Sequence, residues 1–439
     1  MPEAREKAGH EFVSCHAFRN WISLKARTFI ASRTIGISNL VQHTRSVLTL
    51  LIGAALLLSA CDKEPAPVGV DLLPEDDLVD IIRFDTQETG AQVRASSYFE
   101  PVRGINATLL WLGQFAEYES SIAMRWYNFT SPVGEKGEIV EARLTLYPAV
   151  NTFGESSGQV SFNIYQIISE WDEDRVTSDS LNTIATAPEI KGSFTGINTG
   201  DSIVVDLDTA MVRQWITKFT TNIDLPASEV VTEPFGMMIR PNGMNYVQAY
   251  NSADGLTMLP QLRVIIRDGE DLDTLFGTAL RDTYLAKTQT IDETELTLQG
   301  GIGQRGKVWF DVSSIPPGSI VNQVRLYLHR DTLRDVRGNL GIDSVIVYES
   351  LNAEQDSISS SNLLAEAGDD PSIYFAQSSS SNRTITRAVQ RWVNNPASNF
   401  GFTLIKLGET SDLDKIDFYD ASADPALRPR LEVFYSTQP

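Results

Sequence analysis

The residue types that most often carry out catalysis are scarce in this chain. There are two cysteines, Cys15 and Cys61, and only one of the four histidines, His329, lies beyond residue 61. Zinc sites are usually built from several Cys or His ligands, and a Ser-His-Asp triad needs a histidine beside its nucleophile. We therefore expect that this protein is not an enzyme, and that no disulfide forms within the segment after Cys61.

Carboxylates are abundant, and two stretches concentrate them. One stretch carries Asp268, Glu270, Asp271 and Asp273. Their hard oxygen ligands could coordinate Ca²⁺, although the EF-hand spacing is missing and a solvated linker is the alternative interpretation. The other stretch, residues 171–174, could provide two carboxylates for glycoside hydrolysis, a role that only their separation in space can establish.

Three aromatic residues are candidates for contacting a saccharide, because exposed aromatic rings offer flat apolar faces on which a sugar ring can stack. Trp171 lies in a polar stretch, and Tyr246 and Tyr250 flank a loop between late strands of the first half of the chain. A structural position is the alternative for Trp171. These three are the predicted carbohydrate-binding residues.

The chain is strongly acidic. Its 57 Asp and Glu residues against 36 Lys and Arg residues give a net charge of −21 at pH 7. Removing residues 1–61, which carry seven basic and three acidic residues, changes this value to −25. Such a surface repels phosphate backbones, so we expect no nucleic-acid partner. Polyanionic glycans are disfavoured for the same reason, unless a local basic patch or a bridging cation intervenes.

The amino-terminal segment contains an apolar run that predicts export. Val47–Leu58 follows Arg45 and is too short to span a bilayer comfortably, which is typical of a signal-peptide core. The Leu-Ser-Ala-Cys sequence that ends at Cys61 resembles the lipobox of bacterial lipoproteins, in which the Cys thiol receives a diacylglycerol and becomes the new amino terminus. A signal peptide that merely ends in Cys is the alternative.

This resemblance implies a membrane anchor. We expect residues 1–60 to be a signal peptide with a mis-assigned upstream extension, and residues 61–79 to be the lipidated Cys61 with an acidic tether. Several acyl chains would hold the protein to a membrane almost permanently. The acidic stretch directly after Cys61 resembles the surface-export signal of some Gram-negative lipoproteins. The expected location is therefore the outer membrane, with the protein lipid-anchored and exposed at the cell surface.

One unit of the chain occurs twice. In each copy a Phe-Gly pair opens an apolar run, and a Tyr and a Pro follow with a spacing of ten residues. Two tryptophan pairs also match, and their recurrence favours core packing. The copies have Phe235-Gly236, Tyr250 and Pro260 against Phe400-Gly401, Tyr419 and Pro429, with Trp126 matched to Trp309 and Trp215 to Trp392.

Short runs that alternate apolar and polar residues follow the tether, for example at 139–147 and 160–165. This period of two is that of half-buried strands, and many short strands at close spacing indicate a β-sandwich. Short helices are expected near 208–218 and 384–393. We predict two domains, at 80–267 and 282–437, joined by a polar linker at 268–281.

The residues Phe310–Pro316 and Ile320–Leu326 resemble part of the DNRLRE-type, or disaggregatase-related, β-sandwich family. Residues 170–177 are similar to its Trp-x-Glu…Val-Thr segment, and the resemblance spans 80–437 as two copies. It implies a jelly-roll-like sandwich, often on surface-attached polysaccharide-degrading proteins, and some members are carbohydrate-binding modules. The second copy has Ser-Leu-Asn-Ala-Glu at 350–354 where the first has Trp171, so we expect its ligand site to be lost or changed.

Together these observations predict an all-β protein with two tandem jelly-roll-like β-sandwich domains, each with a short helix, after a signal peptide and a tether. The expected function is non-catalytic binding of extracellular polysaccharide at the cell surface, with Ca²⁺ as a candidate ligand. The alternative is a structural or assembly subunit of an outer-membrane surface complex that binds protein partners.

Overall fold

The computed structural model of the protein describes residues 80–103, 107–126, 137–154, 159–222, 235–288, 292, 294–339, 341, 343–353 and 357–437. The chain is 52% strand and 10% helix, which confirms the prediction of an all-β, sandwich-type fold. The predicted signal peptide, Cys61 and the tether at 61–79 lie outside the described residues and stay predictions.

The first β-sandwich has two antiparallel sheets around one apolar core. Its strands are β3 (Leu109–Phe115), β4 (Tyr118–Trp126), β5 (Glu138–Leu146), β6 (Pro148–Phe153), β7 (Gln159–Ile167), β8 (Thr186–Ile197), β9 (Ile203–Asp206), β10 (Met237–Pro241), β11 (Val247–Asn251), β12 (Gln261–Asp268) and β13 (Asp271–Thr288). One sheet joins β9, β5 and β12, the other joins β8, β7, β10, β4, β3, β11 and β6, and β13 pairs with both. Inward-facing side chains such as Leu144, Phe162 and Val264 are fully buried between them.

The second β-sandwich repeats this arrangement. Its strands are β1 (Ile82–Asp85), β2 (Val93–Phe99), β14 (Leu296–Gln299), β15 (Gln304–Phe310), β16 (Ile320–His329), β17 (Val345–Ser350), β18 (Ile358–Ala367), β19 (Ile373–Gln377), β20 (Phe402–Lys406), β21 (Lys415–Phe418) and β22 (Arg430–Ser436). Its core includes Leu326, Val347 and Leu431, none of which is exposed.

Each sandwich carries one longer helix, close to where the sequence predicts it. These are α4 (Thr209–Asn222) and α5 (Thr384–Asn394). Trp215 of α4 stacks on Trp126 with ring centroids 5.9 Å apart, and Trp392 of α5 lies 4.7 Å from the ring of Phe402. The helices are therefore attached by tryptophans that enter the two cores.

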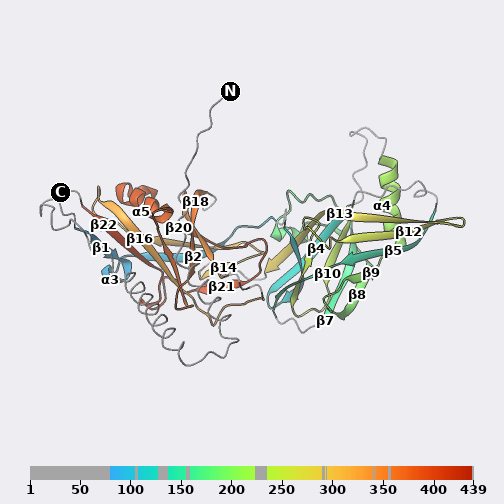
Figure 1. Ribbon diagram of the computed structural model, residues 1–439, viewed down its shortest axis with the longest axis horizontal. Helices are drawn as coiled ribbons and strands as arrows, with labels where there is room; N and C mark the ends of the chain where they lie inside the picture. The colour runs from blue at the N-terminus through green and yellow to red at the C-terminus, as the bar shows by residue number, and fades with distance from the viewer. Residues whose placement is uncertain are drawn as a thin grey trace, which may run out of the picture. The chain divides into compact units, whose positions relative to one another are not determined.

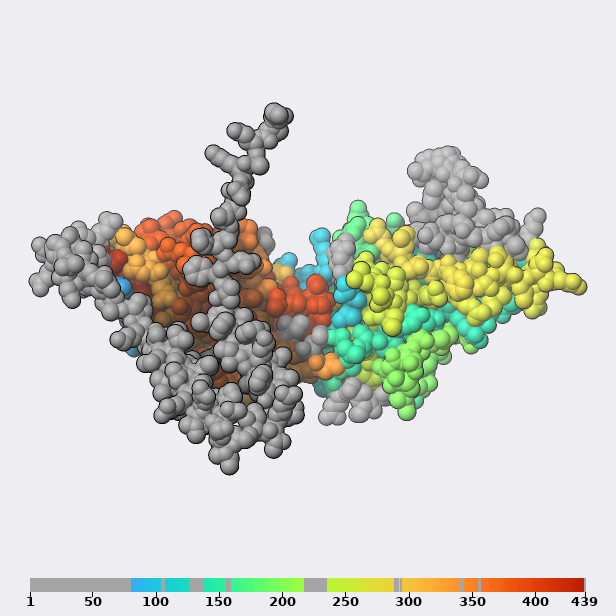
Figure 2. Space-filling model, in the orientation of Figure 1, coloured from blue at the N-terminus to red at the C-terminus, as the bar shows by residue number. Residues whose placement is uncertain are grey.

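The leading strands of the two repeats are exchanged between the sandwiches. β1 pairs with β22 and β2 pairs with β15, although both partners lie in the second half of the chain. β13 pairs instead with β12 and β4 of the first half. In Figure 1 the blue strands accordingly lie among the orange and red ones, and in Figure 2 the yellow atoms of β12 and β13 run together to one tip.

Residues 268–281 are not the linker that the sequence predicts. They form the turn between β12 and β13 and more than half of β13, which pairs with β12 from Asp271 to Thr278. β13 then bulges between Ala279 and Arg281 and continues along β4. Polar and acidic residues suggested a solvated connection, but alternate positions such as Leu275 and Ala279 face the core. A bulge of this kind lets one strand pass from one sheet to the other.

The backbone contacts show which residues of the two repeats are equivalent. This equivalence differs by one residue from the sequence match of Trp126 with Trp309. A Cβ on Gly236 would collide with backbone atoms next to Arg125, and one on Gly401 would collide with those next to Trp309. Trp309 therefore corresponds to Arg125. Phe310, not Trp309, takes the core position of Trp126, and it is fully buried.

The predicted core position of Trp309 is therefore wrong. Its side chain is half-buried and faces outward on β15. Because side chains alternate between the two faces of a strand, a mismatch of one residue moves a side chain from the core to the surface.

The strand exchange predicts that a change near residue 80 weakens the second sandwich. Phe84 of β1 is 4% exposed and belongs to the second core. Phe84→Ala is expected to lower the free energy of unfolding by about 3–5 kcal/mol, because it removes a large buried side chain and leaves a cavity. Phe276→Ala is the control, since Phe276 is 57% exposed; its expected effect is below about 0.5 kcal/mol. Urea unfolding followed by tryptophan fluorescence measures both, and equal effects would contradict the exchange.

Candidate functional site

Burial removes the three predicted carbohydrate-binding residues from contact with a polysaccharide. Trp171 is 6% exposed, Tyr246 1% and Tyr250 0%. The indole N–H of Trp171 donates to the carbonyl of Phe235 at 2.7 Å, and both tyrosines belong to the first core. The prediction that these rings are exposed for stacking is wrong, because the sandwich uses their large apolar faces to fill its interior. Trp171 has the structural position that was its alternative.

The acidic stretch around residue 270 forms the turn of the β12–β13 hairpin. Asp268 and Asp271 are partners across this turn, and both are exposed together with Glu270, while Asp273 lies half-buried on β13. Within the described part of the chain, these four carboxylates are not among the groups close enough to share an ion. The predicted Ca²⁺ site is therefore not formed by these four carboxylates.

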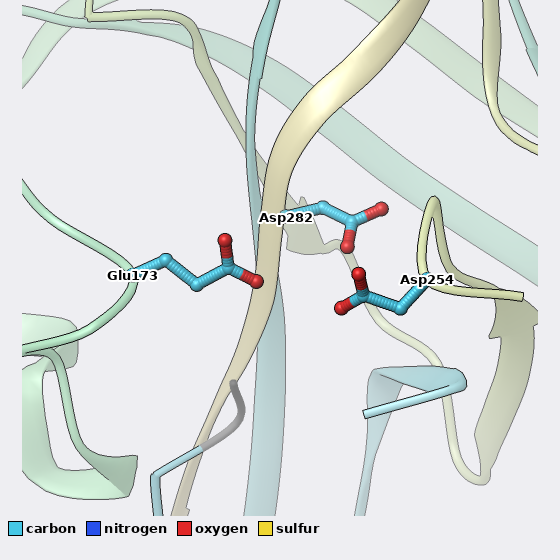
Figure 3. Close-up of side chains that lie close together, drawn as sticks. All are labelled: Glu173, Asp254 and Asp282. Carbon is cyan, nitrogen blue, oxygen red and sulfur yellow. The ribbon is translucent and has the colours of Figure 1, made fainter. Parts of the chain in front are cut away.

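A different set of carboxylates does converge. Glu173 comes from the loop between β7 and β8, Asp254 from the turn after β11, and Asp282 from β13. One oxygen of each lies within 4.8 Å of the others, and in Figure 3 the three carboxylates gather around β13. Glu173 and Asp282 are buried while Asp254 is exposed, so solvent reaches the group beside Asp254.

The surroundings of this trio hold its buried members in place. Asp282 accepts hydrogen bonds from the hydroxyl of Ser252 at 2.8 Å and the backbone N–H of Ala253 at 2.7 Å. An oxygen of Glu173 lies 3.4 Å from the guanidinium of Arg281. The bulge of β13 immediately precedes Arg281 and Asp282, and bulges often re-aim side chains at such places.

Burial makes the trio costly to ionise fully. It raises the pKa of Glu173 to about 7, with further increases from Asp254 and Asp282 and an opposing effect of Arg281. It raises the pKa of Asp282 to about 6, although the bonds from Ala253 and Ser252 favour the charged form. The group can therefore hold a proton near neutral pH.

The same three oxygens could ligate a hard divalent cation, supplying at most half of the six to eight ligands that Ca²⁺ takes. Ala95 stands where Asp282 would be in the second sandwich, since it lies opposite Val308 on β15. Of these three carboxylates, the sequence singles out only Glu173, as part of residues 171–174. Asp282 reaches Glu173 only because β13 pairs with β4 of the first sandwich.

The second sandwich has an open pocket of about 390 Å³ on the outer face of β2 and β15. Trp309 donates its indole N–H to the carbonyl of Asn399 at 3.0 Å, and the guanidinium carbon of Arg94 lies 4.0 Å from the centroid of the Trp309 ring. The pocket thus combines aromatic walls with cationic groups. It is lined by Arg94, Ser96, Lys307, Trp309, Ala353, Asn399 and Phe400.

The matching place in the first sandwich is filled. The two loops begin at equivalent points, since the N–H of Ile167 donates to Gly236 and that of Ser350 donates to Gly401, both at 3.0 Å. In the first sandwich the segment 168–185 then packs its apolar side chains over β4, β10 and β13. In the second, the much shorter segment 351–357 precedes β18. Trp309 and Phe400 are half-buried and line the pocket there.

A further hollow of about 370 Å³ lies beside the turn between β3 and β4. Its walls include the rings of Phe115, Tyr118 and Phe153 and the amides of Gln299 and Gln304. It therefore draws residues from both sandwiches, and carboxylates of Asp292 and Glu295 also line it. The sequence gives no signal for it, since its residues are far apart along the chain.

No protein-family model, curated protein or solved structure matches this chain. Among the described helices, none is long and apolar enough to cross a membrane. The candidate sites are therefore judged by their own geometry.

The pKa of Glu173 predicts a pH-dependent stability. Because its folded pKa of about 7 lies above the ordinary value of 4.5, its contribution to stability is fully present below about pH 4.5 and is lost as the pH rises through 7. Glu173→Gln cannot ionise, so its melting temperature relative to wild type should rise by about 2–4 °C between pH 5 and pH 8. Thermal unfolding in EDTA measures this. The control is Glu270→Gln, at the exposed hairpin turn; a difference for Glu173→Gln that stays constant with pH would contradict the prediction.

Proposed function

We propose that this chain is a lipid-anchored cell-surface protein that binds extracellular polysaccharide without cleaving it. We further propose that the pocket of Trp309 and Phe400 on the second sandwich is the binding site. The observation that carries this proposal is that the same place is filled in one repeat and open in the other. An open position with half-buried aromatic rings is the natural place for a ligand, since unused apolar surface is normally covered.

The chemistry of the pocket supports a saccharide. Ligand pockets are concave and combine apolar or aromatic walls with a few polar groups that fix orientation. Here Trp309 and Phe400 supply ring surface, while Ser96, Lys307 and Asn399 supply polar groups. The sequence predicts candidate binding residues only in the first sandwich and a lost or changed site in the second; this assignment places the site in the second sandwich.

The position of the anchor is compatible with this role. The tether predicted at 61–79 leads directly into β1, which belongs to the second sandwich. A lipid on Cys61 would therefore connect to the sandwich that has the open pocket. The proposed lipid anchor is supported by the lipobox-like sequence, and the proposed surface location by the acidic stretch that follows Cys61.

The alternative function, as a subunit of a surface complex, also has a structural observation in its favour. Leu272, Phe276 and Leu280 are 62%, 57% and 55% exposed. They are spaced by four residues on β13, so they share one face of the strand. An exposed apolar stripe of this kind is a candidate protein-binding surface.

A glycan-binding screen of residues 78–439 tests the proposed function. We expect saturable binding to one or more soluble polysaccharides, with at least tenfold weaker affinity for Trp309→Ala, because that change removes a wall of the pocket. Phe276→Ala is the matched control, since it removes an exposed ring from the first sandwich; it should bind like wild type. Silence across neutral and charged polysaccharides would overturn the proposal. A pull-down from outer membranes that depends on Phe276 would then favour the surface complex.

A further inference from the structure

We infer that the saccharide bound by the second sandwich carries a negatively charged group, a carboxylate or a sulfate, which Arg94 recognises. This inference rests on the proposed function and names its ligand class.

Arg94 lies against an aromatic ring of the pocket. Its guanidinium lies over the ring of Trp309, 4.0 Å from the centroid. Stacking on an aromatic ring occupies the flat face of a guanidinium and leaves its N–H groups, which lie in the plane, free to donate. Contact with Trp309 thereby keeps the guanidinium of Arg94 beside the pocket. Arg94 itself is exposed to solvent, so these donors are accessible from the pocket.

The first sandwich has an equivalent arginine with different partners. Arg281 occupies the matching place on β13 in the first sandwich, and it faces Glu173 at 3.4 Å and Asp174 at 3.8 Å. Among the described residues, no carboxylate forms an ion pair with Arg94. Glu173 and Asp174 belong to the loop that fills the first site, and a ligand anion at Arg94 would take the place that these two side chains hold beside Arg281.

The described lining of the pocket is positively charged. This described lining contains two cations, Arg94 and Lys307, and no carboxylate, although the chain as a whole has a net charge of −21. Lys307 directs its ammonium to the carbonyl of Ala353 at 3.4 Å. Asp311 lies outside this lining and accepts the backbone N–H of Ser313 at 2.9 Å; this bond is the main reason why the pKa of Asp311 is lowered, and Arg94 lowers that pKa further. The described lining of the pocket is therefore cationic, on an acidic protein.

The chemistry that follows is specific. A guanidinium presents a planar fork that binds a carboxylate or sulfate through two parallel hydrogen bonds. Phe400 provides an apolar wall beside it for the carbon face of the sugar ring. A neutral saccharide could use the ring surface but would leave the paired donors of Arg94 without an acceptor of matching charge. An acidic saccharide fits both parts of the pocket.

The test compares three probes by titration calorimetry: a polyuronate, a sulfated dextran and an unmodified dextran. Residues 78–439 should bind at least one anionic probe at least tenfold more tightly than unmodified dextran, and this binding should weaken as salt rises from 50 to 500 mM. Arg94→Gln should lose at least tenfold in affinity for the anionic probe. Arg94→Lys should recover only part of it, because the charge returns without the fork.

The control is Arg175→Gln, which removes the same charge from a side chain that is 86% exposed on the first sandwich; its affinity should be unchanged. Preference for the polyuronate or for the sulfated dextran distinguishes a carboxylate from a sulfate. Binding that is equal for neutral and anionic probes, or unaffected by Arg94→Gln while Trp309→Ala abolishes it, would overturn the inference and leave the proposed function standing. Failure of every probe would overturn both.

Discussion

The exchange of leading strands is the constraint on which the rest of this structure depends. The first sandwich is completed by β13, which pairs with β12 and β4. The second is completed by β1, which pairs with β22, and by β2, which pairs with β15. Without these partners β22 and β12 would each lose a neighbour, and unpaired strand edges favour aggregation. The exchanged strands also bring chemistry, since β13 carries Asp282 and β2 carries Arg94. Both candidate sites therefore exist because a strand crosses from one repeat to the other.

The two repeats solve one packing problem in opposite ways. In the first, Ala123 and Met238 present an apolar outer surface on β4 and β10, and the loop of Trp171 covers it. At the paired positions of the second, Lys307 lies beside Thr403. Thr403 is fully buried and its hydroxyl is hydrogen-bonded to that of Ser350 at 2.9 Å, while Lys307 is half-buried. The shorter loop and the polar surface are thus two aspects of a single divergence, and either change alone would leave an exposed apolar patch or a buried ammonium group.

The sequence predicts the fold well because strand periodicity is local. Alternation of apolar residues and the repeated Phe-Gly pairs lead to two β-sandwiches, and the tryptophans of α4 and α5 mark both helices. The choice of which strands pair with one another is not local. A strand that pairs with the other repeat has the same alternating pattern as a strand that pairs within its own repeat. The linker expected at 268–281 is wrong for this reason.

The candidate sites were harder to predict than the fold. Exposure of Trp171, Tyr246 and Tyr250 cannot be read from sequence, because a large aromatic ring fills a core as readily as it binds a sugar. The error at Trp309 was a shift of one residue, which is invisible in an alignment of tryptophans but reverses the face. Glu173, Asp254 and Asp282 are separated along the chain, so only the three-dimensional pairing brings them together.

The protein is acidic overall, yet the described lining of its pocket is cationic. Whether the overall charge opposes binding of an anion there depends on how far the other carboxylates lie from the pocket. At physiological ionic strength charges are screened over about 8 Å, so carboxylates elsewhere on the surface act weakly on a group bound at Arg94. The charges that matter are those lining the pocket, and there the described residues are cationic. The net negative charge of the protein mainly slows the approach of a polyanion. It also repels polyanions that do not fit the pocket closely. If the proposed function holds, a net charge of −21 around a pocket whose described lining is cationic would favour selective over non-specific binding of an acidic glycan.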